Sequence, residues 1–171
     1  MTAVGPRDEG IRRPRLERTG AVEFKTMGDI ISFAIRREEE SIRDYGEMKS
    51  QAPPGGLRVM LGELEAEEIN HKKLLEDMER AGFAVPDPGI VADMKISDYL
   101  VAETPGSEMS LQDLLILAAK KEEKAAALYG DLAGKAGRPE HRRLFKFLRS
   151  QEKAHKLRLE SEYETFLLEE N

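Results

Sequence analysis

The segment EINHKKLLE (68–76) returns 84 residues later as EKAHKLRLE (152–160). Both copies contain a Glu-x-x-His motif, and this spacing places the glutamate and the histidine on adjacent turns of one helix face. Two of the chain's three histidines fall in these motifs. The pair therefore predicts two helices that each present a carboxylate and an imidazole to the same side.

The same offset aligns the rest of the two halves without a gap. Single glutamates recur as Glu38 and Glu122, and tyrosines recur as Tyr45 and Tyr129. Apolar, basic and turn positions also recur, as Ala34 with Ala118, Ala52 with Ala136, Arg58 with Arg142, and Leu64 with Leu148. The chain is therefore interpreted as a duplicated helical hairpin with approximate two-fold symmetry, the two copies lying at about 26–81 and 110–169.

Four long segments show the apolar periodicity of amphipathic helices, at about 26–51, 56–81, 111–134 and 140–169. Short turns, APPGG (52–56) and KAGRP (135–139), join the helices of each hairpin, and Ser110 is expected to cap the third helix. Residues 82–109 form a long crossover with at most one short helix, near 96–102. Short turns make antiparallel neighbours, and one long crossover is typical of a ferritin-like four-helix bundle. We therefore expect an all-α bundle of that type.

The apolar stripes of the four helices are expected to form the core. In the second helix they include Val59, Met60 and Leu64, and in the fourth they include Leu148, Leu157 and Leu159. Residues 1–24 are rich in arginine, contain two prolines and show little apolar periodicity. We expect them to form a flexible N-terminal tail, which leaves 25–171 for the bundle.

The single glutamates lie where apolar residues are expected. Glu38 follows Ala34 by four residues and precedes Tyr45 by seven, in the middle of an apolar stripe, and Glu122 has the same setting. A carboxylate in a bundle core is costly unless it is paired or bound to a metal. With the two Glu-x-x-His motifs, four carboxylates and two imidazoles would converge: Glu38, Glu68, His71, Glu122, Glu152 and His155. Their four negative charges balance two divalent cations, and this donor set suits iron or manganese, although zinc would also bind.

Each of these motifs, taken alone, also has an explanation that involves no metal. A lone Glu-x-x-His motif usually decorates a helix surface, and a lone glutamate beside an apolar stripe often reaches solvent. The recurrence of all six positions under one offset favours a metal site over a bundle that has lost one. Tyr45 and Tyr129 either hydrogen-bond a metal-binding carboxylate or are core residues whose hydroxyl is satisfied elsewhere. His141 has no carboxylate partner in register and is interpreted as a surface residue.

The composition of the chain excludes several classes of function. The chain carries 27 basic and 33 acidic residues, a net charge of −6, which argues against nucleic acid as the main partner. No apolar run reaches membrane-spanning length, and the N-terminal segment lacks the apolar region of a secretory signal, so we expect a cytoplasmic protein. Cysteine is absent, which excludes disulfides, thiol nucleophiles and cysteine-ligated metals within this sequence.

These motifs resemble those of the rubrerythrin and ferritin-like family, over about residues 27–168. The resemblance rests on the single glutamates with their tyrosines and on the two Glu-x-x-His motifs. It implies a homodimer and a di-iron centre with two iron ions, whose ligands would be terminal carboxylates (Glu38 and Glu122), bridging carboxylates (Glu68 and Glu152) and nitrogen donors (His71 and His155).

Two departures from the family pattern affect the expected chemistry. Rubrerythrins carry a rubredoxin-like cysteine domain that supplies electrons, whereas this sequence has no cysteine, so an external donor such as a rubredoxin-like protein is expected. Rubrerythrins also carry an additional glutamate one turn after the ligand of the third helix, where this chain has Ala125. Ala125 matches Ser41 in the repeat, and this predicts two nearly equivalent metal positions.

Three functions are compatible with these features. The first is a di-iron oxidase or peroxidase that reduces peroxide or dioxygen, with a role in oxidative-stress defence. The second is iron handling, in which the site acts as a ferroxidase or a metal store. The third is a non-catalytic helical interaction module. Consumption of peroxide over many turnovers separates the first two, and the metal content separates both from the third.

Overall fold

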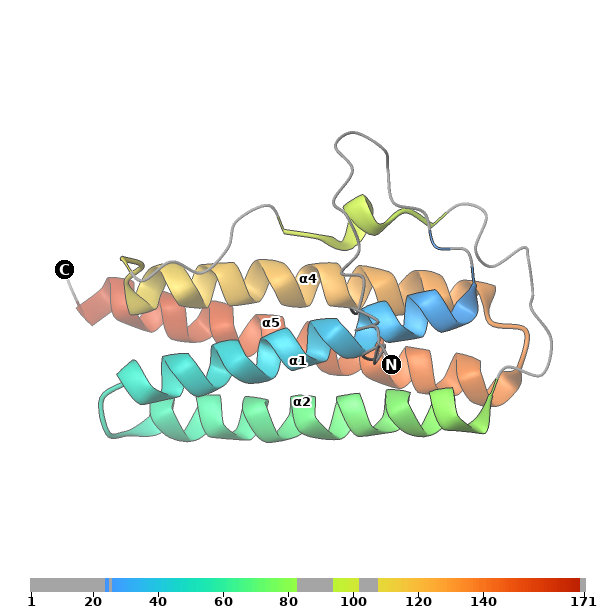
Figure 1. Ribbon diagram of the computed structural model, residues 1–171. Helices are drawn as coiled ribbons and strands as arrows, with labels where there is room; N and C mark the ends of the chain where they lie inside the picture. The colour runs from blue at the N-terminus through green and yellow to red at the C-terminus, as the bar shows by residue number, and fades with distance from the viewer. Residues whose placement is uncertain (1–23, 25, 83–93, 102–107, 170–171) are drawn as a thin grey trace, which may run out of the picture.

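The computed structural model describes residues 24, 26–82, 94–101 and 108–169. In these residues four long helices lie alongside one another (Figure 1): α1 (Met27–Gln51), α2 (Gly56–Ala81), α4 (Leu111–Lys135) and α5 (Pro139–Glu169). A single-turn 3-10 helix, η1 (Ile96–Tyr99), precedes α4. Every end of the long helices lies within one residue of its predicted position, and the predicted all-α four-helix bundle is confirmed.

The helices pair as two antiparallel hairpins, α1 with α2 and α4 with α5 (Figure 1). The crossover carries the chain back along the bundle, so α2 and α4 run in the same direction. Backbone contacts are closer within each hairpin than between the hairpins. The interface between the hairpins is therefore the place where large side chains fit.

The N-terminal caps show the duplication at the level of single hydrogen bonds. At the start of α1, the Thr26 hydroxyl accepts a bond from the amide of Asp29 (3.0 Å), and the Asp29 carboxylate accepts one from the amide of Thr26 (2.9 Å). Ser110 and Asp113 make the same reciprocal pair at the start of α4, at 3.1 Å each. Such a pair satisfies two of the amides that a helix start leaves without intrahelical partners.

The turns between paired helices are also repeated. The Arg58 guanidinium donates to the carbonyl of Ala52, where α1 ends, and Arg142 donates to the carbonyl of Ala136, where α4 ends, both at 2.9 Å. These positions are 84 residues apart in each case. The two hairpins are therefore built by the same local interactions.

The apolar core consists of two clusters that occupy opposite halves of the bundle. One joins the start of α1 to the ends of α2 and α4 and contains Ile31, Leu75 and Leu132. The other joins the end of α1 to the starts of α2 and α4 and contains Met48, Leu61 and Leu115. Buried polar side chains lie near the midpoints of the helices, between these clusters.

Several expectations about core and boundaries need correction. Val59 and Leu157 are 62% and 66% exposed, although both were expected in the core. Phe24 was assigned to the tail but is buried against Phe33, with ring centroids 5.2 Å apart. The short crossover helix ends at Tyr99 rather than near residue 102. Residues 1–23 of the predicted tail, and 83–93 and 102–107 of the crossover, lie outside the described residues.

No helix in the described part of the chain combines the length and the apolar character that crossing a membrane requires.

Candidate metal centre

Six ionisable side chains are buried at the middle of the bundle. They are the six predicted from the repeat, each no more than 2% exposed: Glu38, Glu68, His71, Glu122, Glu152 and His155. Each of the four helices contributes at least one, because the single glutamates lie halfway along α1 and α4 and the Glu-x-x-His motifs lie halfway along α2 and α5. The fold therefore brings together all the residues that the repeat singled out.

These side chains form two overlapping groups that could each hold a metal ion. One consists of Glu38, Glu68, His71 and Glu152, and the other of Glu68, Glu122, Glu152 and His155, with the ligand atoms of each group within 4.8 Å of one another. Glu68 and Glu152 belong to both groups. Two sites that share two carboxylates have the arrangement of a dinuclear centre with bridging ligands.

The Nδ1 atoms of both histidines point at the shared carboxylates. Nδ1 of His71 lies 3.0 Å from Oε2 of Glu68 and 3.0 Å from Oε1 of Glu152. Nδ1 of His155 lies 2.8 Å from Oε1 of Glu68 and 3.5 Å from Oε2 of Glu152. The two imidazole rings stack with centroids 5.4 Å apart. Nδ1 is therefore the donor atom that each ring offers to the centre.

The two tyrosines cross between the hairpins to reach the single glutamates. The Tyr45 hydroxyl, on α1, donates to Oε1 of Glu122 on α4, and the Tyr129 hydroxyl, on α4, donates to Oε1 of Glu38 on α1. Oε2 of Glu38 is left facing Nδ1 of His71 at 3.9 Å. Each tyrosine thus occupies one carboxylate oxygen, which leaves the other turned toward the cluster.

The electrostatics of the cluster divide the four glutamates into two kinds. Burial, together with the charges of Glu68 and Glu152, raises the pKa of Glu38 and of Glu122 well above the ordinary value. Burial alone would also raise the pKa values of Glu68 and Glu152, but their close approach to the outer glutamates and to the two histidines outweighs it and lowers both pKa values. The outer glutamates are therefore disposed to hold protons and the shared ones to be ionised.

The histidines complete the charge balance of the metal-free cluster. Burial by itself lowers their pKa values, but Glu152 and Glu68 outweigh it and raise the pKa of His71 to about 9 and that of His155 to about 10. Two cationic imidazoles then accompany two carboxylates and two neutral carboxyl groups. With these pKa directions the charges of the six side chains balance one another, because the outer glutamates and the histidines are disposed to hold protons.

One feature of the cluster fits a bound divalent cation directly. Neither oxygen of the buried Glu152 carboxylate receives a well-aligned hydrogen bond, although Oε1 lies 3.0 Å from His71. Buried carboxylates without donors are costly, and a divalent cation satisfies such oxygens directly. The oxygen-rich donor set with one imidazole in each group suits iron or manganese. The residues present therefore fit two divalent ions.

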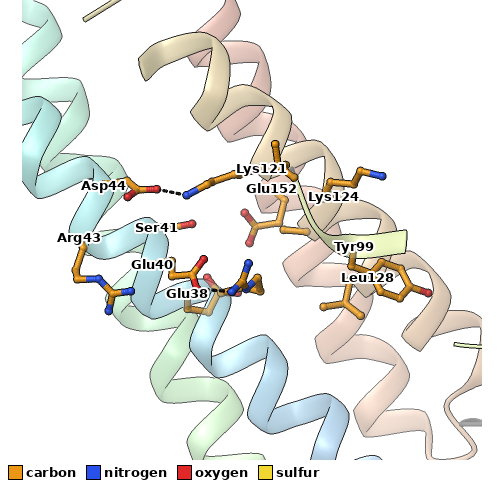
Figure 2. A pocket seen from close by; sticks show the side chains of 13 residues that line it. Glu38, Glu40, Ser41, Arg43, Asp44, Tyr99, Lys121, Lys124, Leu128 and Glu152 are labelled. Atoms are coloured by element: carbon orange, nitrogen blue, oxygen red, sulfur yellow. Dashed lines mark hydrogen bonds and ion pairs between the residues drawn. The ribbon is translucent and has the colours of Figure 1, made fainter. Parts of the chain in front are cut away.

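A pocket of about 350 Å³ opens between α1 and α4 and reaches the cluster at Glu38 and Glu152 (Figure 2). Two small residues that are mates in the repeat, Ser41 and Ala125, line it, and Tyr99 of η1 contributes to its wall. The Tyr99 hydroxyl bonds to Asp131 (2.8 Å), and this bond anchors η1 to α4.

The opposite side of the cluster shows a difference between the halves that the sequence analysis missed. Nε2 of His155 lies 2.6 Å from Oε2 of Glu67, whereas the His71 ring lies nearly perpendicular to the Phe147 ring, with centroids 6.3 Å apart. The repeat carried a signal for this, since Glu67 matches the neutral Gln151. His141, the third histidine, is partly exposed at the start of α5 and belongs to neither ligand group.

Comparison with known proteins identifies the family. The rubrerythrin family model matches residues 29–163. A ferritin-like diiron-carboxylate protein from Thermotoga maritima is similar in structure, with a TM-score of 0.65 and 24% identity over 81% of this chain and 95% of that one. A conserved hypothetical protein from Mycobacterium tuberculosis has a TM-score of 0.58 and 17% identity over 77% of this chain and 92% of that one. No curated protein sequence matches the chain. Because the family model covers most of the chain and extends into all four long helices, this protein belongs to the rubrerythrin family.

Proposed function

We propose that this protein is a di-iron oxidoreductase that reduces peroxide or dioxygen with electrons from an external donor. The observation that carries the proposal is the sharing of Glu68 and Glu152 between two metal-binding groups, beside a pocket that reaches the same cluster. Family membership supports iron as the metal, ahead of manganese and zinc.

The proposed ligand roles follow from the geometry. Glu38 and Glu122 each belong to one group and would be terminal ligands, while Glu68 and Glu152 belong to both and would bridge. The hydroxyls of Tyr129 and Tyr45 hold the terminal carboxylates from behind. This support fixes the direction of each terminal carboxylate before a metal arrives, which lowers the cost of assembling the centre.

The pocket supplies the route for a small oxidant. Its volume of about 350 Å³ has room for roughly ten water molecules, so peroxide or dioxygen would pass easily. Ser41 and Ala125 keep this route open because their side chains are short. Two ferrous ions, when bound, supply the two electrons that the reduction of one peroxide to two waters requires.

Re-reduction would depend on another molecule. The chain has no cysteine and therefore no cysteine-ligated iron of its own to relay electrons. We expect a single fast consumption of about one peroxide per iron-loaded chain, followed by slow turnover until a rubredoxin-like donor is added.

Stopped-flow absorbance of the anaerobically reduced, iron-loaded protein tests this function. A burst on mixing with peroxide is expected in the parent and in His141→Ala, and its loss is expected in Glu68→Ala. No burst, combined with uptake of many ferrous ions per chain in air, would overturn the proposal in favour of iron storage.

A further inference from the structure

The two Glu-x-x-His motifs are related by the repeat, but the side chains that contact the outer side of each histidine, away from the shared glutamates, differ between the two halves. Glu67 immediately precedes Glu68, and its Oε2 lies 2.6 Å from Nε2 of His155. The position 84 residues later is Gln151, which carries no charge. One histidine therefore has a carboxylate behind it at a position where the other half of the chain has an amide.

The carboxylate of Glu67 is itself held in place by the guanidinium group of Arg158. Arg158 approaches Oε1 of Glu67 at 3.5 Å through Nη1, and it binds Oε2 of Glu63 at 2.5 Å through Nη2. The oxygen of Glu67 that faces Arg158 is not the one that faces His155, so both contacts exist together. Arg158, Glu67 and His155 form a chain of polar contacts that leads from the surface to the buried cluster.

The other half of the bundle replaces this chain with apolar side chains. The repeat mates of Arg158 and Glu63 are Leu74 and Phe147. The Phe147 ring stands nearly perpendicular to the His71 ring, at 87°, with centroids 6.3 Å apart. A phenyl ring cannot accept a strong hydrogen bond from an imidazole N–H as a carboxylate does.

A carboxylate beside one histidine and a phenyl ring beside the other are expected to affect metal binding differently. A carboxylate that accepts a hydrogen bond from the far nitrogen of a histidine fixes the ring orientation and tautomer and makes the other nitrogen a stronger donor. In His155 that other nitrogen is Nδ1, which lies 2.8 Å from the shared Glu68. Loss of such a support typically weakens metal affinity by about 10–100-fold.

We infer that the two metal positions are inequivalent, and that Glu67 is a positioning residue that makes the His155 position the tighter of the two for divalent ions. The inference rests on the proposed dinuclear centre and corrects the near-equivalence that the repeat alone predicts. Arg158 maintains the effect by holding Glu67 against His155.

Calorimetric titration of the chelator-stripped full chain with Mn²⁺ under anaerobic conditions tests the inference. The parent is expected to bind two ions in two resolved steps. Glu67→Gln is expected to weaken the tighter step by about 10–100-fold and leave the weaker step unchanged. Glu123→Gln removes the same charge from an exposed position of α4, where Glu123 pairs with Lys156, and is expected to change neither step.

Single-histidine variants assign the effect to one position. In His71→Ala, which keeps the His155 position, Glu67→Gln should weaken the remaining tight step by the same factor as in the parent. In His155→Ala, Glu67→Gln should leave the remaining step unchanged, since its imidazole partner is gone. A general effect on folding would instead weaken binding in both backgrounds and lower the melting temperature of the metal-free protein.

The outcomes separate this inference from the proposed function. Two ions bound by the parent with a peroxide burst, but no change in either step on Glu67→Gln, would overturn the inference and leave the proposed function standing. Equal weakening in both histidine backgrounds would also overturn it. A parent that binds no Mn²⁺ and no Fe²⁺ would overturn both.

Discussion

Raising the pH above neutrality is expected to destabilise the metal-free protein through its two buried histidines. Glu152 and Glu68 raise the pKa of His71 to about 9 and that of His155 to about 10, against an ordinary value near 6.5. Between these values the folded state keeps protons that the unfolded state has released. The free energy of unfolding therefore falls as the pH rises through this range, and the full benefit is present only below about pH 6.5.

The size of the effect follows from the number of protons involved. For each histidine that is protonated in the folded state and neutral in the unfolded state, the free energy of unfolding falls by about 1.4 kcal/mol per pH unit. The two histidines together therefore lower it by about 2.5 kcal/mol between pH 7.5 and pH 8.5. The raised pKa values of Glu38 and Glu122 act in the same direction. Against a typical total stability of about 5–15 kcal/mol, this loss is large.

Urea denaturation of chelator-stripped protein at pH 7.5, 8.0 and 8.5 measures this slope. The metal-loaded protein serves as the control, because metal ions rather than protons then neutralise the cluster, and its stability should change little over the same range. A matched measurement on His71→Gln should show about half of the parent slope. A metal-free stability that stays level or rises over this interval would refute the assigned charge state of the cluster.

Three further outcomes test the centre and the pocket. Adding ferrous or manganous ion at about 1,000 times its dissociation constant should stabilise the parent by about 4 kcal/mol for each ion bound, measured in denaturation curves, whereas Glu68→Ala should gain little and His141→Ala should gain the parent amount. Tyr129→Phe should lower the free energy of unfolding by about 1–3 kcal/mol because Oε1 of the buried Glu38 loses its donor, while Tyr163→Phe should have a smaller effect. Ala125→Leu should slow the peroxide burst several-fold by filling the pocket, and Ala127→Leu, on the exposed face of α4, should leave the rate unchanged. Equal rates in the two alanine variants would argue against the pocket as the route.

The fold could be predicted from the sequence because its signals repeat. Each hairpin carries its own cap, turn and apolar stripe, so a boundary read in one half is checked by its mate in the other. Thr26 and Ser110, for example, are mates that cap α1 and α4 in the same way. The six buried ionisable residues were found for the same reason, since polar residues that recur at core positions are rarely accidental.

The errors in the predicted core lie at apolar positions whose mates in the repeat are charged. Val59 matches Arg143 and Leu157 matches Lys73, so a charged mate marked each as a surface position despite its apolar side chain. Phe24 was missed because its burial depends on Phe33, nine residues away in the next helix, and not on local periodicity.

The contacts on the outer side of the histidines and the pocket beside the cluster could not be predicted from residue spacing alone. The contact of Glu67 with His155 depends on the rotation of α2 against α5, which the chain determines through the packing of the whole bundle. The pocket between α1 and α4 depends on which side chains are short at the helix crossing. The external electron donor and the homodimer stay predictions.

The metal content of protein purified under anaerobic conditions tests the central claim most directly. Elemental analysis should find close to two divalent ions per chain, with iron predominant, and less than that in Glu68→Ala. A metal-free parent that also fails to take up ferrous ion under the same conditions would contradict the claim that the buried carboxylates and histidines form a dinuclear metal centre.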